Sequence, residues 1–175
     1  KTTRCGEDQI ISRSGLDRQT VSLFSDYIRD YIETSRYLKE DLLFPGVENL
    51  LEQLSIHHRC RIISARRNDR RFLEQISQLG LGKYFDQVLV APTQRPGGRE
   101  LTAKASAMKS AADSNTAMMI VGDTEDDIVS GHQLNMKTVA VTSGIRKRDY
   151  IETLNPDYIL ASVTELVTCL ENDVE

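Results

Sequence analysis

The chain alternates between short apolar runs and amphipathic helical patterns, and this alternation limits the folds that it can adopt. The apolar runs, which we interpret as strands, lie at residues 60–64, 87–91, 117–122, 137–144 and 157–160. The helical patterns that follow them lie at residues 68–80, 102–113, 124–135, 146–153 and 162–170. The runs do not alternate with polar residues, which is typical of strands buried on both faces. The repetition predicts an α/β fold, a Rossmann-like doubly wound parallel sheet with right-handed crossovers.

The first 42 residues do not follow this alternation. Residues 1–15 are polar and unpatterned, and we expect a loop there. Over residues 17–41, apolar side chains recur at three- and four-residue steps, as on one face of a helix. A Pro–Gly break follows, and residues 47–54 predict a further helix. We therefore expect two regions, a helical one at 1–42 and an α/β core at 43–175.

Composition excludes several classes of protein. The 175 residues suffice for one large domain, and the net charge of −4 argues against a nucleic-acid partner. The three cysteines are far apart and form no CxxC pair, which argues against a zinc site and indicates reduced thiols in the cytoplasm. No apolar run approaches the roughly 20 residues of a membrane span, and no signal-peptide pattern opens the chain.

Two acidic residues follow the strand expected at 117–122. In open parallel sheets, ligands bind beyond the carboxyl ends of the strands. Asp123 directly follows the apolar run, and Asp127 lies one helical turn later on the same face. Such a pair can hold a hard cation such as Mg²⁺, which takes few carboxylates and keeps several waters. The alternative is that the acids and Thr124 cap the helix and interact favourably with its dipole.

Other strand ends carry groups suited to an anion. Ser64 ends the strand at 60–64, where its hydroxyl and the amides of the following turn, beginning with Ala65, can bind phosphate oxygens. The alternative for Ser64 is a local turn or helix cap. Arg66 is the arginine nearest this strand end that could contact an anionic substrate, although a solvated helix face is the alternative. Lys104, early in the helix expected at 102–113, could neutralise phosphate charge.

Together these segments resemble the haloacid dehalogenase-like superfamily, in particular its phosphoglycolate phosphatase-like branch. LFPGVENLLEQL resembles the segment that returns from a helical cap to the core, and MMIVGDTEDDIVSG matches the fourth family motif, GDxxxD. IIS resembles the second motif and TAKASAMKSAA the third. The resemblance implies that Ser64, Ala65, Arg66 and Lys104 bind substrate and that Asp123 holds Mg²⁺. Asp127 would support the metal or position Lys104. Ser64, Lys104 and Asp127 would then be catalytic.

One expected motif is absent. Members of this superfamily carry DxDGT at the end of an early strand, where the first Asp attacks phosphorus and the second acts as acid and base. No DxD occurs before residue 43. Three explanations remain open: the motif lies upstream of Lys1, the protein is a non-catalytic relative, or another chain supplies the strand. The non-Met start and the unpaired backbone groups that a missing strand would leave favour the first explanation.

The resemblance thus implies a Mg²⁺-dependent phosphatase that hydrolyses a small phosphomonoester through an aspartyl-phosphate. The expected partner is a small phosphorylated metabolite in the cytoplasm, with no nucleic acid and no membrane. Residues 1–42 would be a partial helical cap, and residues 43–175 a core without its first strand. The alternative function is that of a catalytically inactive binding or regulatory module with the same fold. The sequence does not identify the substrate or the oligomeric state.

Overall fold

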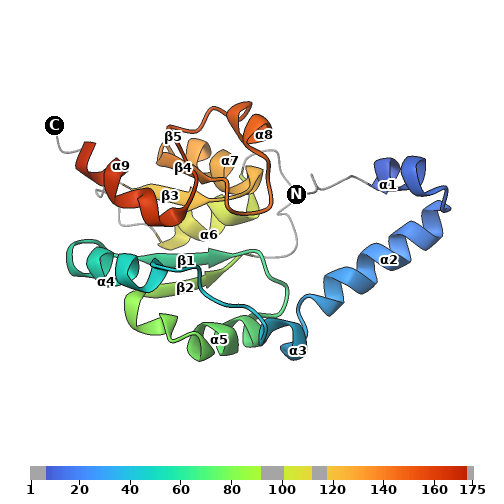
Figure 1. Ribbon diagram of the computed structural model, residues 1–175, viewed down its shortest axis with the longest axis horizontal. Coiled ribbons are helices and arrows are strands. Elements are labelled where there is room, and N and C mark those ends of the chain that lie inside the picture. Colours follow the sequence, from blue (N-terminus) through green and yellow to red (C-terminus); the bar gives the residue numbers. More distant parts are fainter. Residues whose placement is uncertain (1–6, 92–100, 112–117, 173–175) are drawn as a thin grey trace.

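The computed structural model describes residues 7–91, 101–111 and 118–172, and it has the α/β architecture expected from the sequence (Figure 1). In chain order the elements are α1 (Glu7–Ser14), α2 (Arg18–Tyr31), α3 (Ser35–Leu38), α4 (Val47–His57), β1 (Arg61–Ser64), α5 (Asp69–Gln78), the 3₁₀ helix η1 (Leu81–Tyr84), β2 (Gln87–Val90), α6 (Ala103–Ala111), β3 (Met119–Gly122), α7 (Glu125–Gln133), β4 (Lys137–Val141), α8 (Arg148–Glu152), β5 (Tyr158–Leu160), the 3₁₀ helix η2 (Val163–Glu165) and α9 (Leu166–Asn172). The expected ends of α6 at 112–113 and of β3 at 117 lie outside the described residues.

The described strands form two parallel sheets instead of one. β1 pairs with β2, and β3, β4 and β5 form a second sheet with β4 in the middle. In the described part of the chain, no strand pairs with the second edge of β1 or of β3. Open edges on both β1 and β3 are what a missing strand between them would leave. The single continuous sheet expected from the alternation is therefore interrupted between β1 and β3.

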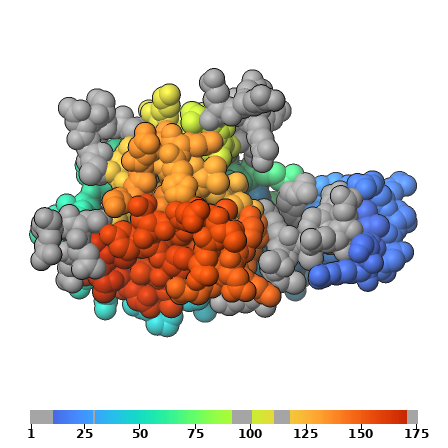
Figure 2. All heavy atoms as spheres, turned by 90° about the horizontal axis from the view of Figure 1, so that it is seen from above, coloured from blue at the N-terminus to red at the C-terminus, as the bar shows by residue number. Residues whose placement is uncertain are grey.

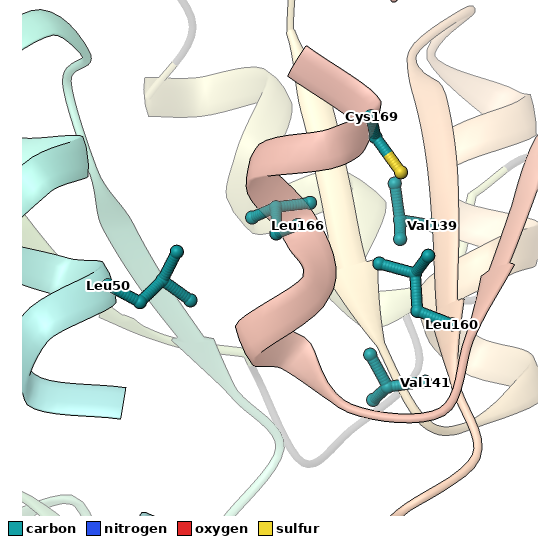
Figure 3. Close-up of a cluster of buried hydrophobic side chains, with 6 residues drawn as sticks. All are labelled: Leu50, Val139, Val141, Leu160, Leu166 and Cys169. Atoms are coloured by element: carbon teal, nitrogen blue, oxygen red, sulfur yellow. The ribbon is translucent and has the colours of Figure 1, made fainter. Parts of the chain in front are cut away.

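β4 is buried on both faces, which explains its continuous apolar sequence. Side chains alternate in direction along a strand, so Val139 and Val141 point to one face and Ala140 to the other. The two valines pack with residues of α4, β5 and α9 in one core cluster: Leu50, Leu160, Leu166 and Cys169 (Figure 3). Ala140 packs on Ile128 of α7 and Ile151 of α8. Burial of each large aliphatic side chain here stabilises the fold by about 1.5–3 kcal/mol.

A second core lies under the β1–β2 sheet. Phe72 and Ile76 of α5 pack there with Leu81 and Tyr84 of η1. Helix α4 contributes to both cores, because Leu50 belongs to the cluster on β4 whereas Leu51 packs against the cluster on β1 and β2. Helix α6 contacts β1 and β2 as well as α7. These two helices therefore join the sheets.

The N-terminal segment differs from the expected loop and single helix. Residues 7–14 form α1, which ends where Gly15 adopts a left-handed φ of 69° and its amide bonds to the carbonyl of Ile11 at 3.1 Å. Asp17 caps α2, since its Oδ1 accepts a hydrogen bond from the amide of Thr20 at 2.8 Å. The helix expected at 17–41 is broken after α2, because Thr34 caps the separate helix α3.

The helices α1 and α2 form an arm that extends away from the sheets (Figures 1 and 2). On the helix face expected from the sequence, Val21 is buried, whereas the other apolar residues are exposed: Phe24, Ile28, Tyr31 and Ile32. Leu23 and Tyr27 add to the exposed apolar surface beside this face. Leu23 and Tyr27 are each 64% exposed, and Phe24 is 56% exposed. The arm thus presents a stripe of large apolar side chains that the described residues do not cover. None of the helices in the described ranges combines the length and the apolar character needed to cross a membrane.

Asp157 and Thr138 form a reciprocal pair at the amino end of β4. The Oδ2 atom of Asp157 accepts hydrogen bonds from the amide and the hydroxyl of Thr138, each at 2.8 Å, and the amide of Asp157 donates to Thr138 Oγ1 at 2.9 Å. The hydrogen bond from the Thr138 amide, then that from its hydroxyl, lower the pKa of Asp157, while partial burial opposes them. The charged carboxylate is therefore favoured in the folded state.

We expect Asp157→Asn to weaken the acid sensitivity of the fold. Because the folded-state pKa lies below the unfolded value of about 3.9, the stabilisation by Asp157 is present above that pH. It is lost as the pH falls through the folded-state pKa, and asparagine, which does not titrate, has no such loss. Urea unfolding should be measured at pH 7, 5 and 3. We expect the wild type to have the higher midpoint at pH 7 and the difference between the two midpoints to be smaller at pH 3. A constant difference across this range would contradict the prediction.

Candidate active site

Asp123 lies at the carboxyl end of β3, and the loop after β4 fixes its carboxylate. Oδ2 of Asp123 accepts a hydrogen bond from the amide of Ile145 at 2.7 Å. Within the described ranges, Oδ1 has no hydrogen-bond partner, and the residue is half-buried. One carboxylate oxygen is thus anchored by the protein and the other remains available to a ligand.

Asp127, in the first turn of α7, has both carboxylate oxygens engaged. Oδ1 accepts a hydrogen bond from Lys104 Nζ at 2.6 Å. Oδ2 accepts hydrogen bonds from the amide and the hydroxyl of Thr124, at 3.1 and 2.6 Å. The side chains of Lys104 and Asp127 are 13% and 9% exposed, so this is a buried charge pair. In this arrangement Asp127 orients Lys104 and completes the N-terminal cap of α7. Both of its carboxylate oxygens already accept hydrogen bonds, so neither is available to a metal ion.

Helix α6 brings Lys104 to this position through contacts with α7. The hydroxyl of Thr102 caps α6 by accepting a hydrogen bond from the amide of Ala105 at 3.0 Å. The amide of Thr102 donates to Gln133 Oε1 at 2.9 Å, and its hydroxyl shares a hydrogen bond with buried Ser130. The cap of α6 is therefore tied to α7, which holds Lys104 over Asp127.

Two glycines let the backbone approach the carboxylates closely. A Cβ added at Gly122 would lie 2.1 Å from Cγ of Asp127, and one at Gly144 would lie 2.1 Å from Oδ2 of Asp123. Any larger residue at either position must displace a carboxylate. Gly122 belongs to the GDxxxD motif, whereas sequence reasoning did not single out Gly144; each is the last residue of an expected strand.

Ser64 lies on the other sheet, at the carboxyl end of β1. Its Oγ accepts a hydrogen bond from the amide of Arg66 at 3.2 Å, which is a local turn of the kind that serines form. No hydrogen bond between described residues joins Ser64 to Asp123 or Lys104. Figure 1 shows the arrows of β1 and β3 pointing the same way. Ser64, which ends β1, and Asp123, which follows β3, therefore lie at the same edge of the fold, on the two sides of the interruption.

The residues after Ser64 contact the segment that follows α2. Nη2 of Arg66 lies 3.6 Å from Oδ2 of Asp41, and its Nη1 donates to the carbonyl of Ile32 at 3.4 Å. The carboxylate of Glu33 accepts hydrogen bonds from the amides of Arg67 and Asn68, at 3.0 and 2.9 Å. Sequence reasoning missed Glu33, because its partners lie more than 30 residues away. Ala65, which precedes these residues, is exposed.

The described residues fit a divalent cation that takes few ligands from the protein. No group of three His, Cys, Asp or Glu side chains suited to a metal occurs among them, so a closed structural metal site is not formed there. Mg²⁺ requires no such group, since it binds one or two protein carboxylates and keeps several waters. Asp123 Oδ1 is a hard oxygen donor of the required kind. Most of the coordination would be left to water and substrate.

Comparisons with known proteins agree with this architecture. The family model described as haloacid dehalogenase-like hydrolase matches residues 2–141. Phosphoglycolate phosphatase of Vibrio parahaemolyticus is 26% identical over 175 aligned positions, which cover 93% of this chain and 75% of the relative. Pyrophosphatase PpaX of Oceanobacillus iheyensis is 24% identical over 125 positions, which cover 71% of this chain and 58% of the relative. The chain thus spans less than two thirds of that pyrophosphatase.

Solved structures show the same fold at low identity. A haloacid dehalogenase-like family hydrolase from Streptococcus pneumoniae superposes with a TM-score of 0.71 at 21% identity, covering 94% of this chain and 75% of that one. Protein Tyrosine Kinase A of Mycobacterium tuberculosis gives a TM-score of 0.70 at 20% identity, covering 94% and 76%. Because proteins with such different names share the fold, activity has to be argued from the site.

Proposed function

The chain belongs to the haloacid dehalogenase-like hydrolase family, and on that premise we propose that it is part of a Mg²⁺-dependent phosphatase for a small phosphomonoester. The observation that carries the proposal is the buried contact of Lys104 Nζ with Asp127, 2.6 Å long, beside Asp123 at the end of β3. A lysine held by a carboxylate, next to an anchored aspartate with one available oxygen, suits the negative charge of a phosphoryl group.

Each site residue then has a chemical role. Asp123 would hold Mg²⁺, which when bound supplies charge neutralisation at the phosphoryl oxygens. Lys104 neutralises further phosphoryl charge, and Asp127 keeps its ammonium group in place. Ser64 and the amide of Ala65 bind phosphate oxygens from the β1 side of the site. Arg66 is the second-rank candidate for substrate contact, since it already pairs with Asp41.

We further propose that the nucleophile lies on a strand between β1 and β3, upstream of residue 1 in the complete protein. A carboxylate of its DxD sequence attacks phosphorus, and the second Asp gives a proton to the leaving alcohol. Water then hydrolyses the aspartyl-phosphate and releases phosphate. The unpaired edges of β1 and β3 support this proposal, because a parallel strand there would complete both ladders.

The domain assignment is proposed on similar grounds. Residues 1–42 would be part of a helical cap, and residues 43–175 the core. The exposed apolar stripe on α2, with Leu23 and Tyr27 each 64% exposed, supports a cap whose remaining helices cover it. The protein would act on a metabolite in the cytoplasm without membrane or nucleic-acid partners.

Turnover by the complete protein tests this function. Release of phosphate from 2-phosphoglycolate, p-nitrophenyl phosphate and pyrophosphate should be measured with Mg²⁺ and with EDTA. We expect hydrolysis of at least one phosphomonoester, a drop of about 100-fold or more with EDTA, and recovery when Mg²⁺ is restored. A protein that binds phosphomonoesters without hydrolysing them would instead be the inactive binding or regulatory module. Hydrolysis of pyrophosphate alone would contradict the proposed substrate class.

A further inference from the structure

An ion pair between buried Arg146 and half-buried Glu125 lies beside Asp123 and has no role in the function proposed so far. Arg146 donates from Nε to Oε2 of Glu125 at 2.6 Å and from Nη2 to Oε1 at 2.5 Å. The Arg146 side chain is 5% exposed, and the guanidinium lies over the ring of Tyr150, with Cζ 5.8 Å from the ring centroid. The bidentate hydrogen bonds to Glu125 raise the pKa of Arg146, against the effect of burial.

Stability alone is a poor explanation for this pair. Desolvation of the buried Arg146 charge opposes its attraction to Glu125, whose side chain is 32% exposed, so the net gain in stability from the pair is small. In addition, Nη1 of Arg146 is buried and has no hydrogen-bond partner in the described part of the chain. A buried donor without a hydrogen-bond partner destabilises a fold. The position of this guanidinium is therefore better explained by the two segments that it connects than by a gain in stability.

The pair joins the two segments that fix Asp123. Glu125 lies two residues after Asp123 at the start of α7, and Arg146 directly follows Ile145 in the loop after β4. The amide of Ile145 holds Oδ2 of Asp123 at 2.7 Å. Gly144, the residue before it, packs so closely on this carboxylate that a Cβ would clash with it. Movement of the loop away from α7 would therefore release Asp123.

We propose that Arg146, held by Glu125 and Tyr150, is a positioning residue that keeps the Ile145 amide on Asp123. One carboxylate oxygen is thereby fixed and the other is directed to the cation. The role of the cation in this inference rests on the proposed function. The dependence of the Ile145–Asp123 hydrogen bond on Arg146 concerns this chain alone. Arg146 acts through Ile145 and Asp123 and does not contact the substrate.

Arg146→Lys and Glu125→Gln in the complete protein test this role. Lysine keeps the charge but cannot form the bidentate fork, and glutamine keeps the shape of Glu125 without its charge. We expect each to raise the Mg²⁺ concentration for half-maximal turnover by about 10–100-fold, as loss of outer-shell partners does. The KM for the phosphomonoester at saturating Mg²⁺ should not change. Hydrogen exchange of the Ile145 amide should become faster in both variants.

Matched variants separate positioning from stability. Arg148→Lys alters an exposed arginine that pairs with Glu152 at 2.9 Å, and it should leave the Mg²⁺ requirement unchanged. Gly144→Ala should raise the requirement while leaving the Glu125–Arg146 pair intact. A lower melting temperature with an unchanged Mg²⁺ requirement, or a rise in KM alone, would overturn the inference. If wild type shows no turnover, the proposed function fails, and Mg²⁺ titration calorimetry with Ile145 exchange still decides the role of Arg146.

Discussion

Asp123→Asn is expected to reduce the Mg²⁺-dependent phosphatase activity of the complete protein by about 100-fold or more. Asparagine has nearly the same shape and can still accept the hydrogen bond from the Ile145 amide, which is 2.7 Å long in the structure. It has no charge with which to hold a divalent cation. Loss of about 3 kcal/mol of transition-state stabilisation corresponds to about 100-fold in rate. Initial rates over a range of Mg²⁺ concentrations measure the effect.

Asp126→Asn provides the matched control. Asp126 lies in the first turn of α7, three residues after Asp123, and is exposed, so its substitution removes the same charge near the start of the helix. We expect this variant to retain nearly full activity, and circular dichroism to show both variants folded. Equal losses in the two variants would attribute the effect to the general charge of this turn. Full activity of Asp123→Asn would show that the metal assignment is wrong.

Lys104→Met is expected to lower both stability and activity. Methionine keeps the aliphatic stem but leaves the carboxylate of Asp127, 9% exposed, without its cation. Removing one partner of a buried pair costs about 3–5 kcal/mol, which urea unfolding at neutral pH can measure. Turnover should fall by about 100-fold or more, because the ammonium group no longer neutralises the phosphoryl group.

Two further variants give this prediction its controls. Lys109→Met lies on the same helix at an exposed position and should change neither quantity appreciably. Addition of Asp127→Asn to Lys104→Met removes the unpaired charge, so we expect much of the lost stability to return while activity stays low. A double variant less stable than Lys104→Met would contradict the assignment of the stability loss to an uncompensated carboxylate.

The sequence predicted the order of the elements well, because the signals concerned are local. Each apolar run from residue 60 onward became a strand within a few residues of its expected position, and Gly80, with a φ of 66°, follows the end of α5 as expected. The contact of Lys104 with Asp127 matches one of the two roles that the family resemblance implied for Asp127. Continuity of the sheet was not predictable from the alternation, which does not show whether neighbouring runs pair.

Contacts between distant residues could not be predicted from the patterns. Nothing in the sequence around Ile145 indicates that its amide meets Asp123, and Glu125 and Arg146 each resemble ordinary surface charges. Glu33 holds two backbone amides more than 30 residues away. Helix α1 was expected to be a loop, since its sequence is polar and its apolar content too low for a clear period. These features depend on how elements pack, which a single sequence does not encode locally.

The division of α4 between the two cores has a consequence for unfolding. Consecutive residues of one helix, Leu50 and Leu51, pack on different sheets. If one sheet loses its packing, α4 becomes partly exposed, and the core on the other sheet also depends on α4. The two sheets, although no ladder connects them in the described residues, should melt as a single cooperative unit with coincident transitions by different probes.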